Sequence, residues 1–524
     1  ALLVCAAAPL LSQTYDLVLK GGHIIDPANN LNEVRDIAIS GNRIAAVQAH
    51  IAPSSAKKVI DATGLYVVPG LVDLHAHVFG YEGSLSPDET ALPAGTTTIV
   101  DAGGSGWRTF DEFRRTVIAR SKTRVLADIN IVGAGMVGEP AESNVEDMDP
   151  AKTAAVIQQN RDVIVGIKTA HFAKPGWDAI DRAVAAGKIA QVPVMVDDKI
   201  FTNTGRTTRD KLLVHLRPGD IHTHMYNDRQ LELVNRFNGK LQPYMLEARQ
   251  RGVLFDLGHG GGSFLWPVAA KAMAQGFPPD TISTDLHSSS IMIQQSDMPN
   301  CMSKMMLLGM SLPDAVLRST VNPAKAIHRY PELGTLGVGQ TADIAVLDLK
   351  NGVFAFKDAW GAKRLGTKRL ECAYTIRNGD VVYQRPSEEA PANTTEIYDL
   401  LIRTGADDVA VIGTKIARLT PRLRASQARI VIDAVGYTVR PGLVEVASTP
   451  LPDYIALRRG ITRVVADAGS APSQTRLDAG QPADIAIFDG KRCILTIRAG
   501  KVVWDSEGLA AVDWIRAGPY TNFK

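Results

Sequence analysis

The sequence predicts an α/β protein built around a parallel β-barrel, and three observations support this prediction. Short apolar runs alternate with longer amphipathic stretches over about 260 residues, a pattern typical of parallel strands joined by helices. Polar residues recur at the ends of many of these runs, which favours a barrel over an open sheet with a single switch point. Segments that flank this interior return near the C-terminus, and both copies alternate as half-buried antiparallel strands do.

Seven strand-like segments follow one another through the interior of the chain. They read TTTIVDAG from Thr96, RVLADINIVG from Arg124, VIVGIKTAH from Val163, VPVMVDD from Val192, DIHTHMYN from Asp220, VLFDLGHGG from Val253 and DTISTDLHS from Asp280. Between them, Ala151–Arg161 and Trp177–Ala190 have the spacing of amphipathic helices. Repeating strand–helix units of this length indicate a barrel, with an open parallel sheet as the alternative.

The flanking segments form an internal repeat. Residues 36–74 align with residues 408–446 without a gap, and 17 of the 39 positions are identical. Three further pairs of similar segments are YDLVLKGG from Tyr15 with YDLLIRTG from Tyr398, ADIAVLD with ADIAIFD, and ECAYTIRNGDVVY with RCILTIRAGKVVW. Cys372 and Cys493 occupy equivalent positions, and a buried, small apolar side chain explains both better than redox chemistry does.

Composition limits the classes of function. The chain has 57 Lys and Arg against 55 Asp and Glu, so it lacks the basic excess of a nucleic-acid-binding protein. Four cysteines in 524 residues exclude a disulfide scaffold. With 45% hydrophobic and 21% charged residues, and no run long enough to span a bilayer, we expect a globular enzyme that acts on a small molecule.

The first residues differ from the rest. Ala1–Leu11 reads ALLVCAAAPLL, which is similar to the end of a signal peptide, so we expect residues 1–13 to be a residual leader. Cys5 raises the alternative of a lipid anchor, but Val4 stands where a small residue is expected. The prediction is a periplasmic or secreted protein, or a cytoplasmic one if the leader is not functional.

The strongest chemical signal is the pair His75 and His77 in PGLVDLHAH. Residues two apart on a strand point to the same face, so both imidazoles can reach one cation. Lys168 ends the apolar run VIVGIK, where a lysine either reaches the barrel rim or is carboxylated by carbon dioxide. Burial favours the carbamate because it leaves the amine neutral.

Further polar residues end the later strands. His224 lies in DIHTHMYN, and Asp285 lies in DTISTDLHS, where it either moves a proton beside a metal or caps a turn. His171, His259 and His287 are possible substrate contacts, and an ordinary place at the barrel rim is the alternative for each.

The motifs PGLVDLHAH, VGIK, DIHTHMYN, FDLGHGGGSF and ISTDLHS, in this order, resemble those of the amidohydrolase superfamily, in particular its dihydroorotase-like, deacetylase-type branch. The resemblance runs from about Tyr15 to Arg385 and its combination of motifs is specific. It implies a (β/α)8 TIM barrel and a β-sandwich split between segments on either side. The predicted domains are the leader 1–13, an N-terminal sandwich segment 14–68, the barrel 69–330, a second segment of the same sandwich 331–386, a degenerate second β-sandwich copy 395–505 and a tail 506–524.

The resemblance also implies two divalent metal ions. His75, His77 and Asp285 would bind one ion, His224 would bind the other, and carboxylated Lys168 would bridge them. Members of this superfamily hydrolyse amide or ester bonds through a metal-bridging hydroxide, with the aspartate of the last strand as proton shuttle.

One position departs from this pattern. The fifth strand of the family usually ends in a histidine ligand of the second metal, whereas VPVMVDD offers Asp197. A carboxylate binds Zn²⁺ at about 2.0–2.2 Å and suits Mn²⁺ better than imidazole does. We therefore expect zinc, with manganese as the alternative at the second site.

The second copy lacks the metal ligands. In the ungapped alignment His75 becomes Ala447 and His77 becomes Thr449, and the interior that holds the other ligands is absent. We expect a non-catalytic β-domain that covers a sheet edge or contributes to a homo-oligomer contact.

The sequence thus predicts a metal-dependent hydrolase of an N-acyl amino acid or acylated hydroxy acid, similar to deacetylases and aminoacylases. A cyclic-amide hydrolase of dihydroorotase or hydantoinase type is the alternative within catalysis. A barrel scaffold without turnover is the alternative outside it, and the convergent polar groups count against this because they are costly to keep in a barrel mouth.

Overall fold

The computed structural model describes residues 15–197, 211–227, 233–386, 397–447, 452–467 and 476–510. The predicted leader, residues 1–13, and residues 511–524 of the predicted tail lie outside these ranges. The chain divides into two compact units. The first unit comprises residues 1–349, 358–360 and 370–385, and the second comprises residues 350–357, 361–369 and 386–524. Residues 331–386, predicted as the second segment of a sandwich, are therefore divided between the units.

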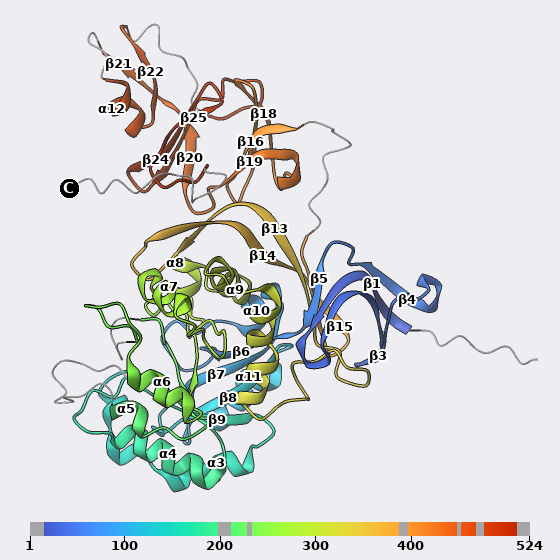
Figure 1. The fold of residues 1–524 in the computed structure, drawn as a ribbon, viewed down its shortest axis with the longest axis vertical. Coiled ribbons are helices and arrows are strands. Elements are labelled where there is room, and N and C mark those ends of the chain that lie inside the picture. Colours follow the sequence, from blue (N-terminus) through green and yellow to red (C-terminus); the bar gives the residue numbers. More distant parts are fainter. Residues whose placement is uncertain are drawn as a thin grey trace, which may run out of the picture. The chain divides into compact units, whose positions relative to one another are not determined.

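The centre of the first unit is a seven-stranded sheet whose neighbours follow the order of the sequence and are all parallel (Figure 1). Its strands are β6 (Leu71–Ala76), β7 (Thr96–Gly106), β8 (Arg124–Asn130), β9 (Ile164–Ala170), β10 (Val194–Asp197), β11 (Ile221–His222) and β12 (Leu254–Phe255). β6, β7 and β9 are buried along their whole length, as expected of strands that are covered on both faces. This curled parallel sheet fits a partial barrel.

The last predicted strand, residues 280–288, is not a regular strand in the structure. Thr281 forms an isolated parallel bridge with Asp256 after β12, and Leu286 forms another with Ala76 of β6. The segment therefore links the two edge strands of the sheet. The Thr281 and Ser283 hydroxyls donate to the buried carboxylate of Asp256. The backbone amide of Thr284 donates to the carboxylate of Asp73, and Asp285 has a left-handed backbone, φ 46°.

Helices follow the strands, and both predicted helices are present. α3 (Pro150–Gln159) begins at Asp149, whose carboxylate caps the amides of Ala151 and Lys152. α4 (Asp178–Ala190) packs against β9 and β10 with its buried alanine and isoleucine face. The other helices of this unit are α1 (Pro87–Thr90), α2 (Phe110–Thr116), α5 (Lys211–Val214), α6 (Pro243–Gln250), α7 (Trp266–Ala274), α8 (Ser288–Gln294), α9 (Met298–Leu307), α10 (Leu312–Ser319) and α11 (Val321–Ala326). In the described parts of the chain, no helix combines the length and apolarity needed to cross a membrane.

A mainly antiparallel β-region flanks the barrel sheet in the first unit, and two of its strands include residues 350–357 and 363–369, which belong to the second unit. Its strands are β1 (Tyr15–Asp26), β2 (Leu31–Ser40), β3 (Arg43–Gln48), β4 (Ala56–Asp61), β5 (Tyr66–Pro69), β13 (Ile344–Lys357), β14 (Lys363–Arg377) and β15 (Asp380–Gln384). β1 pairs antiparallel with β2 and parallel with β4 and β5, and β5 pairs antiparallel with β13. Segments from before and after the barrel sheet thus share one hydrophobic cluster, which includes Leu17, Ile39 and Ile344.

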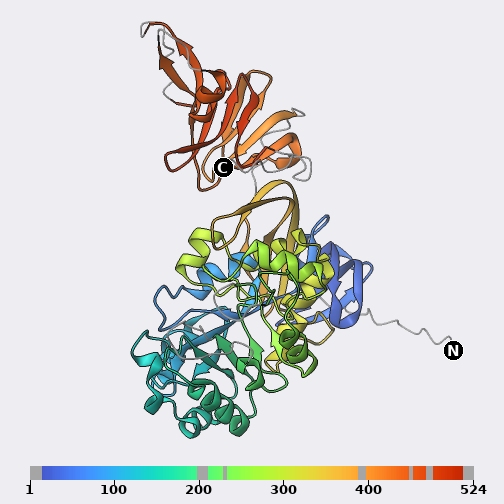
Figure 2. The same ribbon diagram turned by 60° about the vertical axis from the view of Figure 1, so that its left-hand side comes forward.

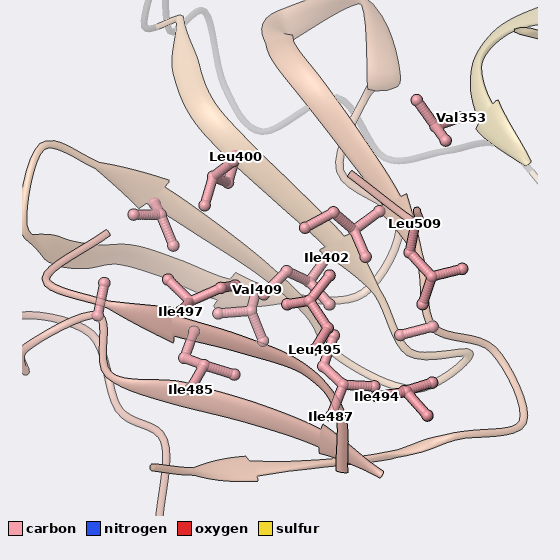
Figure 3. Packing of buried hydrophobic residues seen from close by; sticks show 14 of the residues in the cluster. Val353, Leu400, Ile402, Val409, Ile485, Ile487, Ile494, Leu495, Ile497 and Leu509 are labelled. Carbon is pink, nitrogen blue, oxygen red and sulfur yellow. The ribbon is translucent and has the colours of Figure 1, made fainter. Parts of the chain in front are cut away.

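The second unit is formed almost entirely by strands (Figure 2). They are β16 (Tyr398–Arg403), β17 (Asp408–Ile412), β18 (Lys415–Thr420), β19 (Ala428–Asp433), β20 (Thr438–Pro441), β21 (Leu443–Val446), β22 (Ile461–Val465), β23 (Ile485–Asp489), β24 (Arg492–Arg498) and β25 (Lys501–Asp505). Among its described residues the unit also contains one α-helix, α12 (Asp453–Arg458). Ile402 of β16, Val409 of β17, Ile487 of β23 and Leu495 of β24 point toward one another in its core (Figure 3).

Strand pairing is the same at equivalent positions of the two units. Tyr15 of β1 is opposite Ala56 of β4, and Tyr398 of β16 is opposite Ala428 of β19, in parallel pairs. Pro69 of β5 is opposite Ile344 of β13, and Pro441 of β20 is opposite Ile485 of β23, in antiparallel pairs. The residues paired in the second unit are those that the sequence repeat aligns with the first.

The second unit also contains a strand–helix–strand segment between its repeated strands. β21, α12 and β22 form this segment, and the two strands are parallel, as β6 and β7 are. The Sγ atoms of Cys372 and Cys493 lie 3.3 Å from the hydroxyls of Thr375 and Thr496, respectively. These hydroxyls donate to the carbonyl of Leu92, in the helical turn η3 (Leu92–Ala94), and to the carbonyl of Leu457, in α12. Both cysteines are buried and unpaired, as predicted.

Candidate metal centre

The predicted polar residues meet in a cavity of about 160 Å³ at the carboxyl ends of the parallel strands. Polar groups dominate its lining. The lining residues are His77, Tyr81, Met136, His171, Asp197, His224, Asn227, Gly261, Gly262, Ser263, Asp285, His287 and Ser289. Strands of a barrel all present this end to the same side, so side chains distant in the sequence converge there.

The first group of possible metal ligands consists of His75, His77 and Asp285. One ligand atom from each residue lies within 4.8 Å of the others. Asp285 Oδ1 is 2.9 Å from His77 Nε2 and 3.5 Å from His75 Nε2. All three residues are buried, and two imidazoles with one carboxylate are a donor set that Zn²⁺ accepts.

A hydrogen-bonded chain orients the imidazole of His75. Its Nδ1 lies 2.9 Å from Thr223 Oγ1, and this hydroxyl donates to Asp256 Oδ2 at 2.7 Å. Asp256 also accepts hydrogen bonds from Thr281 and Ser283, at 2.7 and 2.6 Å. With the Thr223 hydroxyl donating to Asp256, Nδ1 of His75 carries the proton and Nε2 faces the centre with its lone pair.

Lys168 reaches the same centre from β9. Its side chain is fully buried, and Nζ lies 2.9 Å from His75 Nε2 and 3.6 Å from Met195 Sδ. Burial lowers the pKa of the Lys168 amine, although nearby carboxylates oppose the shift. Gly103 leaves room for this side chain, because a Cβ at that position would lie 2.7 Å from Lys168 Cβ.

Asp197 and His224 form a second group. His224 Nε2 lies 3.1 Å from Asp197 Oδ2 and 3.9 Å from Asp285 Oδ2, so it faces both the neighbouring strand end and the first group. His224 Nδ1 lies 2.6 Å from the Gly258 carbonyl and donates to it. The nitrogen that faces the centre is again Nε2, held in place by a bond from the other ring nitrogen.

The charges of this site are strongly coupled. Burial alone would raise the pKa of Asp285, but His75, His287 and His77 hold it well below the ordinary value. The pKa of Asp197 is likewise lowered, against the effect of burial, by His224. Burial together with the charge of Lys168 lowers the pKa of His75 to about 3. In the first group, an ionised carboxylate lies beside neutral imidazoles, which are the protonation states that metal ligands require, so these residues fit a divalent metal. At the second group, Asp197 raises the pKa of His224 against the effect of burial.

Among the predicted substrate contacts, two of three line the cavity. His171 and His287 are lining residues, and His287 Nδ1 donates to the Asp285 carbonyl at 2.7 Å. His259 is fully buried behind the cavity, where its Nε2 lies 2.8 Å from Lys304 Nζ and its ring stacks on Phe264. The glycines beside it allow close packing, since a Cβ at Gly260 would lie 2.3 Å from Asp285 Oδ2.

Several residues of the site were not identified from the sequence. Tyr81 and Asn227 line the cavity, and burial raises the pKa of Tyr81 to about 12. Thr223 and Asp256 hold the imidazole of His75 through hydrogen bonds, and Glu142 lies beside Nδ1 of His171. Thr223 lies inside the motif DIHTHMYN, between the two histidines, but its role depends on the register of neighbouring strands.

Comparisons with known proteins identify the family. Two sequence profiles described as amidohydrolase family match residues 58–129 and residues 266–382. A deacetylase from Agrobacterium fabrum is 32% identical over 361 residues, which cover 66% of this chain and 86% of that protein.

Solved structures agree with this assignment. A structure described as an adenine deaminase has a TM-score of 0.65 at 28% identity and covers 71% of this chain and 100% of its own. A dihydroorotase structure has a TM-score of 0.62 at 29% identity, and the match covers 70% of this chain and 97% of the dihydroorotase chain. These neighbours are TIM-barrel proteins, in agreement with the parallel sheet. The chain therefore belongs to the amidohydrolase family and is a hydrolytic enzyme that acts on carbon–nitrogen bonds.

Proposed function

We propose that this enzyme is a metal-dependent deacetylase-like hydrolase, which removes an acyl group from a small N-acyl amino acid or acylated hydroxy acid. The observation that carries the proposal is the convergence of His75, His77 and Asp285, with one ligand atom of each within 4.8 Å of the others, beside a polar cavity that His77 and Asp285 line. The deacetylase relative supports the acyl-transfer chemistry, because it spans most of the same chain. The cavity of about 160 Å³ favours a small substrate.

The chain's own residues would hold two divalent ions, which we propose to be zinc, with manganese as the alternative at the second site. His75, His77 and Asp285 would bind the first ion, and Asp197 and His224 the second. When bound, such ions polarise a carbonyl group and lower the pKa of water. The chain contributes fixed imidazole orientations through Thr223 and the Gly258 carbonyl, so little reorganisation is needed on binding.

Lys168 is the proposed bridge between the ions, as a carbamate formed with carbon dioxide. Its Nζ lies beside His75 Nε2, and burial favours the neutral amine that this reaction needs. A carbamate would end the Lys168 side chain in a carboxylate group, and carboxylate oxygens are donors that divalent metals accept together with imidazole.

Asp285 is the proposed proton carrier. Its carboxylate is ionised because neighbouring imidazoles lower its pKa, so it can accept a proton from water and deliver it to the departing nitrogen or oxygen. His287, whose Nδ1 is 3.6 Å from Asp285 Oδ1, lies on the cavity side of this carboxylate. His171, His287 and Asn227 are placed to contact the substrate.

A cyclic-amide hydrolase is the second candidate. The dihydroorotase structure, with a TM-score of 0.62, is the observation that favours it. Its cyclic substrates need no leaving group to depart, so the two candidates differ in whether a free acid, such as acetate, is released.

We further propose that the second unit is a degenerate copy of the split β-sandwich without catalytic function. The equal strand registers support this proposal. Ala447 stands where the first unit has His75, which leaves this unit without the first metal ligand.

Metal content and a substrate panel test the proposed function. We expect the purified full-length chain to contain tightly bound divalent metal by elemental analysis, and turnover to be lost on chelation and restored by zinc or manganese. A panel of acyl amino acids, acyl hydroxy acids and cyclic amides should show turnover, with release of free acid from an acylated member. A chain that carries no metal, and gains none from excess zinc, would contradict the proposal.

A further inference from the structure

The proposed second metal site has fewer closely spaced donor atoms than the first. In the described residues, the first group alone brings three donor atoms within 4.8 Å of one another. At the second site Asp197 stands where the family pattern has a histidine, which leaves His224 as the imidazole identified from the sequence. A further neutral nitrogen donor would give this site the mixed nitrogen and oxygen set that zinc sites commonly have.

His171 lies next to Asp197 at this second site. It follows directly after β9, and its backbone amide donates to the Asp197 carbonyl at 3.1 Å, so the two residues lie side by side at the carboxyl end of the sheet. His171 Nε2 is 3.5 Å from Asp197 Oδ2, the same oxygen that lies 3.1 Å from His224 Nε2. One carboxylate oxygen therefore faces both imidazoles, and all three side chains line the cavity.

The other nitrogen of His171 is held by a buried carboxylate. Its Nδ1 lies 2.9 Å from Glu142 Oε2, and Glu142 is 3% exposed. The second oxygen of Glu142 accepts the amide of Gly138 at 2.8 Å, which fixes the carboxylate. A carboxylate behind a histidine is the usual support of a metal-binding imidazole, because it holds the ring and raises the basicity of the free nitrogen.

Three imidazoles of the cavity thus share one arrangement. His75 is held through Nδ1 by Thr223, His224 by the Gly258 carbonyl and His171 by Glu142. In each ring Nε2 is the nitrogen that faces a carboxylate of the site, Asp285 or Asp197. The orientation of His171 is therefore that of the two predicted ligands.

The backbone of His171 has the same conformation as two predicted ligands. Its φ is 57°, against 60° for His224 and 46° for Asp285, and each residue lies just beyond a strand or strand-like segment. A left-handed backbone is unfavourable for residues other than glycine and persists where the surroundings enforce it, most often at functional sites.

We infer that His171 is a ligand of the second metal ion and supplies, from the end of β9, the imidazole that Asp197 replaces at the end of β10. The inference rests on the proposed function, because it concerns the same metal-dependent site. The ion would take Nε2 of His171 and of His224 together with the Asp197 carboxylate. These donors are more widely spaced than those of the first group, so we expect the second ion to bind more weakly than the first.

The test measures metal, not turnover. The full-length chain is stripped with a chelator and titrated with Zn²⁺ by calorimetry, and bound zinc is counted by elemental analysis after dialysis. We expect two ions for the unaltered chain and one for His171→Ala, with the tighter binding step unchanged. His287→Asn is the matched control, since it removes another imidazole of the same cavity, and it should retain two ions.

Two further variants separate a ligand from a structural role. Glu142→Gln keeps an acceptor for His171 Nδ1 but removes its charge, and we expect about 10- to 100-fold weaker binding at the weaker step alone. The double variant His171→Ala with Asp197→His restores an imidazole at the end of β10, and we expect it to bind two ions again. Circular dichroism checks that each variant is folded.

The outcomes distinguish this inference from the proposed function. Two ions bound to His171→Ala with unchanged affinities would overturn the role of His171 and leave the proposed function intact. A single ion in the unaltered chain would also overturn it, while a one-metal hydrolase would remain. Failure of the double variant to regain the second ion would show that His171→Ala acts through the fold, and would overturn the inference as well.

Discussion

The same strand sequence occurs in both units with different burial. Residues 69–72 and residues 441–444 both read PGLV, and in each unit a strand begins here. In the first unit every residue of β6 is buried, whereas β21 is exposed or half-buried throughout. β6 belongs to a seven-stranded parallel sheet, and β21 pairs with β22 in a sheet of two strands.

This difference separates strand formation from site formation. The local pattern of β-branched and apolar residues is enough to form a strand in both places. Burial on both faces comes from the strands and helices that follow β6 in the barrel, and the polar ligands are buried with it. The second unit stops after one strand–helix–strand segment, and Ala447 follows its strand in place of His75.

The largest expected effect comes from removing the amine of Lys168, which has no counterpart in the second unit. Lys168→Ala should reduce turnover by at least about 10³-fold, because it removes the proposed bridge of a site that polarises the substrate. Steady-state assays on the best substrate of the panel measure this. Carbon-13 bicarbonate should give a carbamate signal in the unaltered chain and none in the variant. Unchanged turnover would eliminate the bridging carbamate.

A smaller effect is expected from the support of His75. Thr223→Val keeps the shape of the side chain but breaks the link between His75 and Asp256, so metal affinity at the first site should fall by about 10- to 100-fold. Thr223→Ser retains the hydroxyl and should bind metal as the unaltered chain does. Competition with a chromophoric chelator measures both affinities, and equal values for the two variants would contradict the role of the hydroxyl.

The equivalent leucines of the two strands test the difference in burial directly. Leu71 is fully buried and Leu443 is 36% exposed. Leu71→Ala should lower the free energy of unfolding by about 2–5 kcal/mol, the range of buried leucines, and Leu443→Ala by less than about 1 kcal/mol. Urea unfolding followed by fluorescence and circular dichroism gives both values, and similar losses would show that β21 is covered in solution.

The smallest effect on the site is expected from removing most of the second unit. A chain that ends at residue 394 keeps every proposed ligand, so its metal content should equal that of the full chain by elemental analysis. Val353 and Leu365 lose most of their hydrophobic cluster, so a lower thermal stability is expected. A folded barrel that has lost its metal would show that the second unit contributes to the site.

Much of the site was predictable because it follows from strand periodicity. The spacing of His75 and His77 directs both imidazoles to one side at the end of β6, and Asp285, in the last strand-like segment, lies beside them. Lys168, Asp197 and His224 were likewise predicted, since each lies toward the end of a strand of one parallel sheet. The irregular form of residues 280–288 was not predictable, because the backbone amide of Thr284 donates to the carboxylate of Asp73, which lies far away in the sequence.

The supporting residues could not be found from spacing. Thr223 bonds to Asp256 across two strands whose relative register is set only when the sheet forms. Glu142 reaches His171 from a short helical turn, η5 (Ala141–Ser143), whose position depends on the loops that follow β8. His259 is a residue type expected in a cavity, but its contact with Lys304 keeps it behind the residues that line the cavity.

The sequence by itself determined most of the strands, the repeat and the candidate metal ligands, because these depend on periodicity and residue chemistry over a few positions. Only the tertiary structure decided which strand is buried, which nitrogen of each imidazole faces the centre and which carboxylate holds it. Those properties depend on neighbours from distant parts of the chain. The apolar run PGLV therefore begins a fully buried strand that leads to the site in one unit and a partly exposed strand in the other.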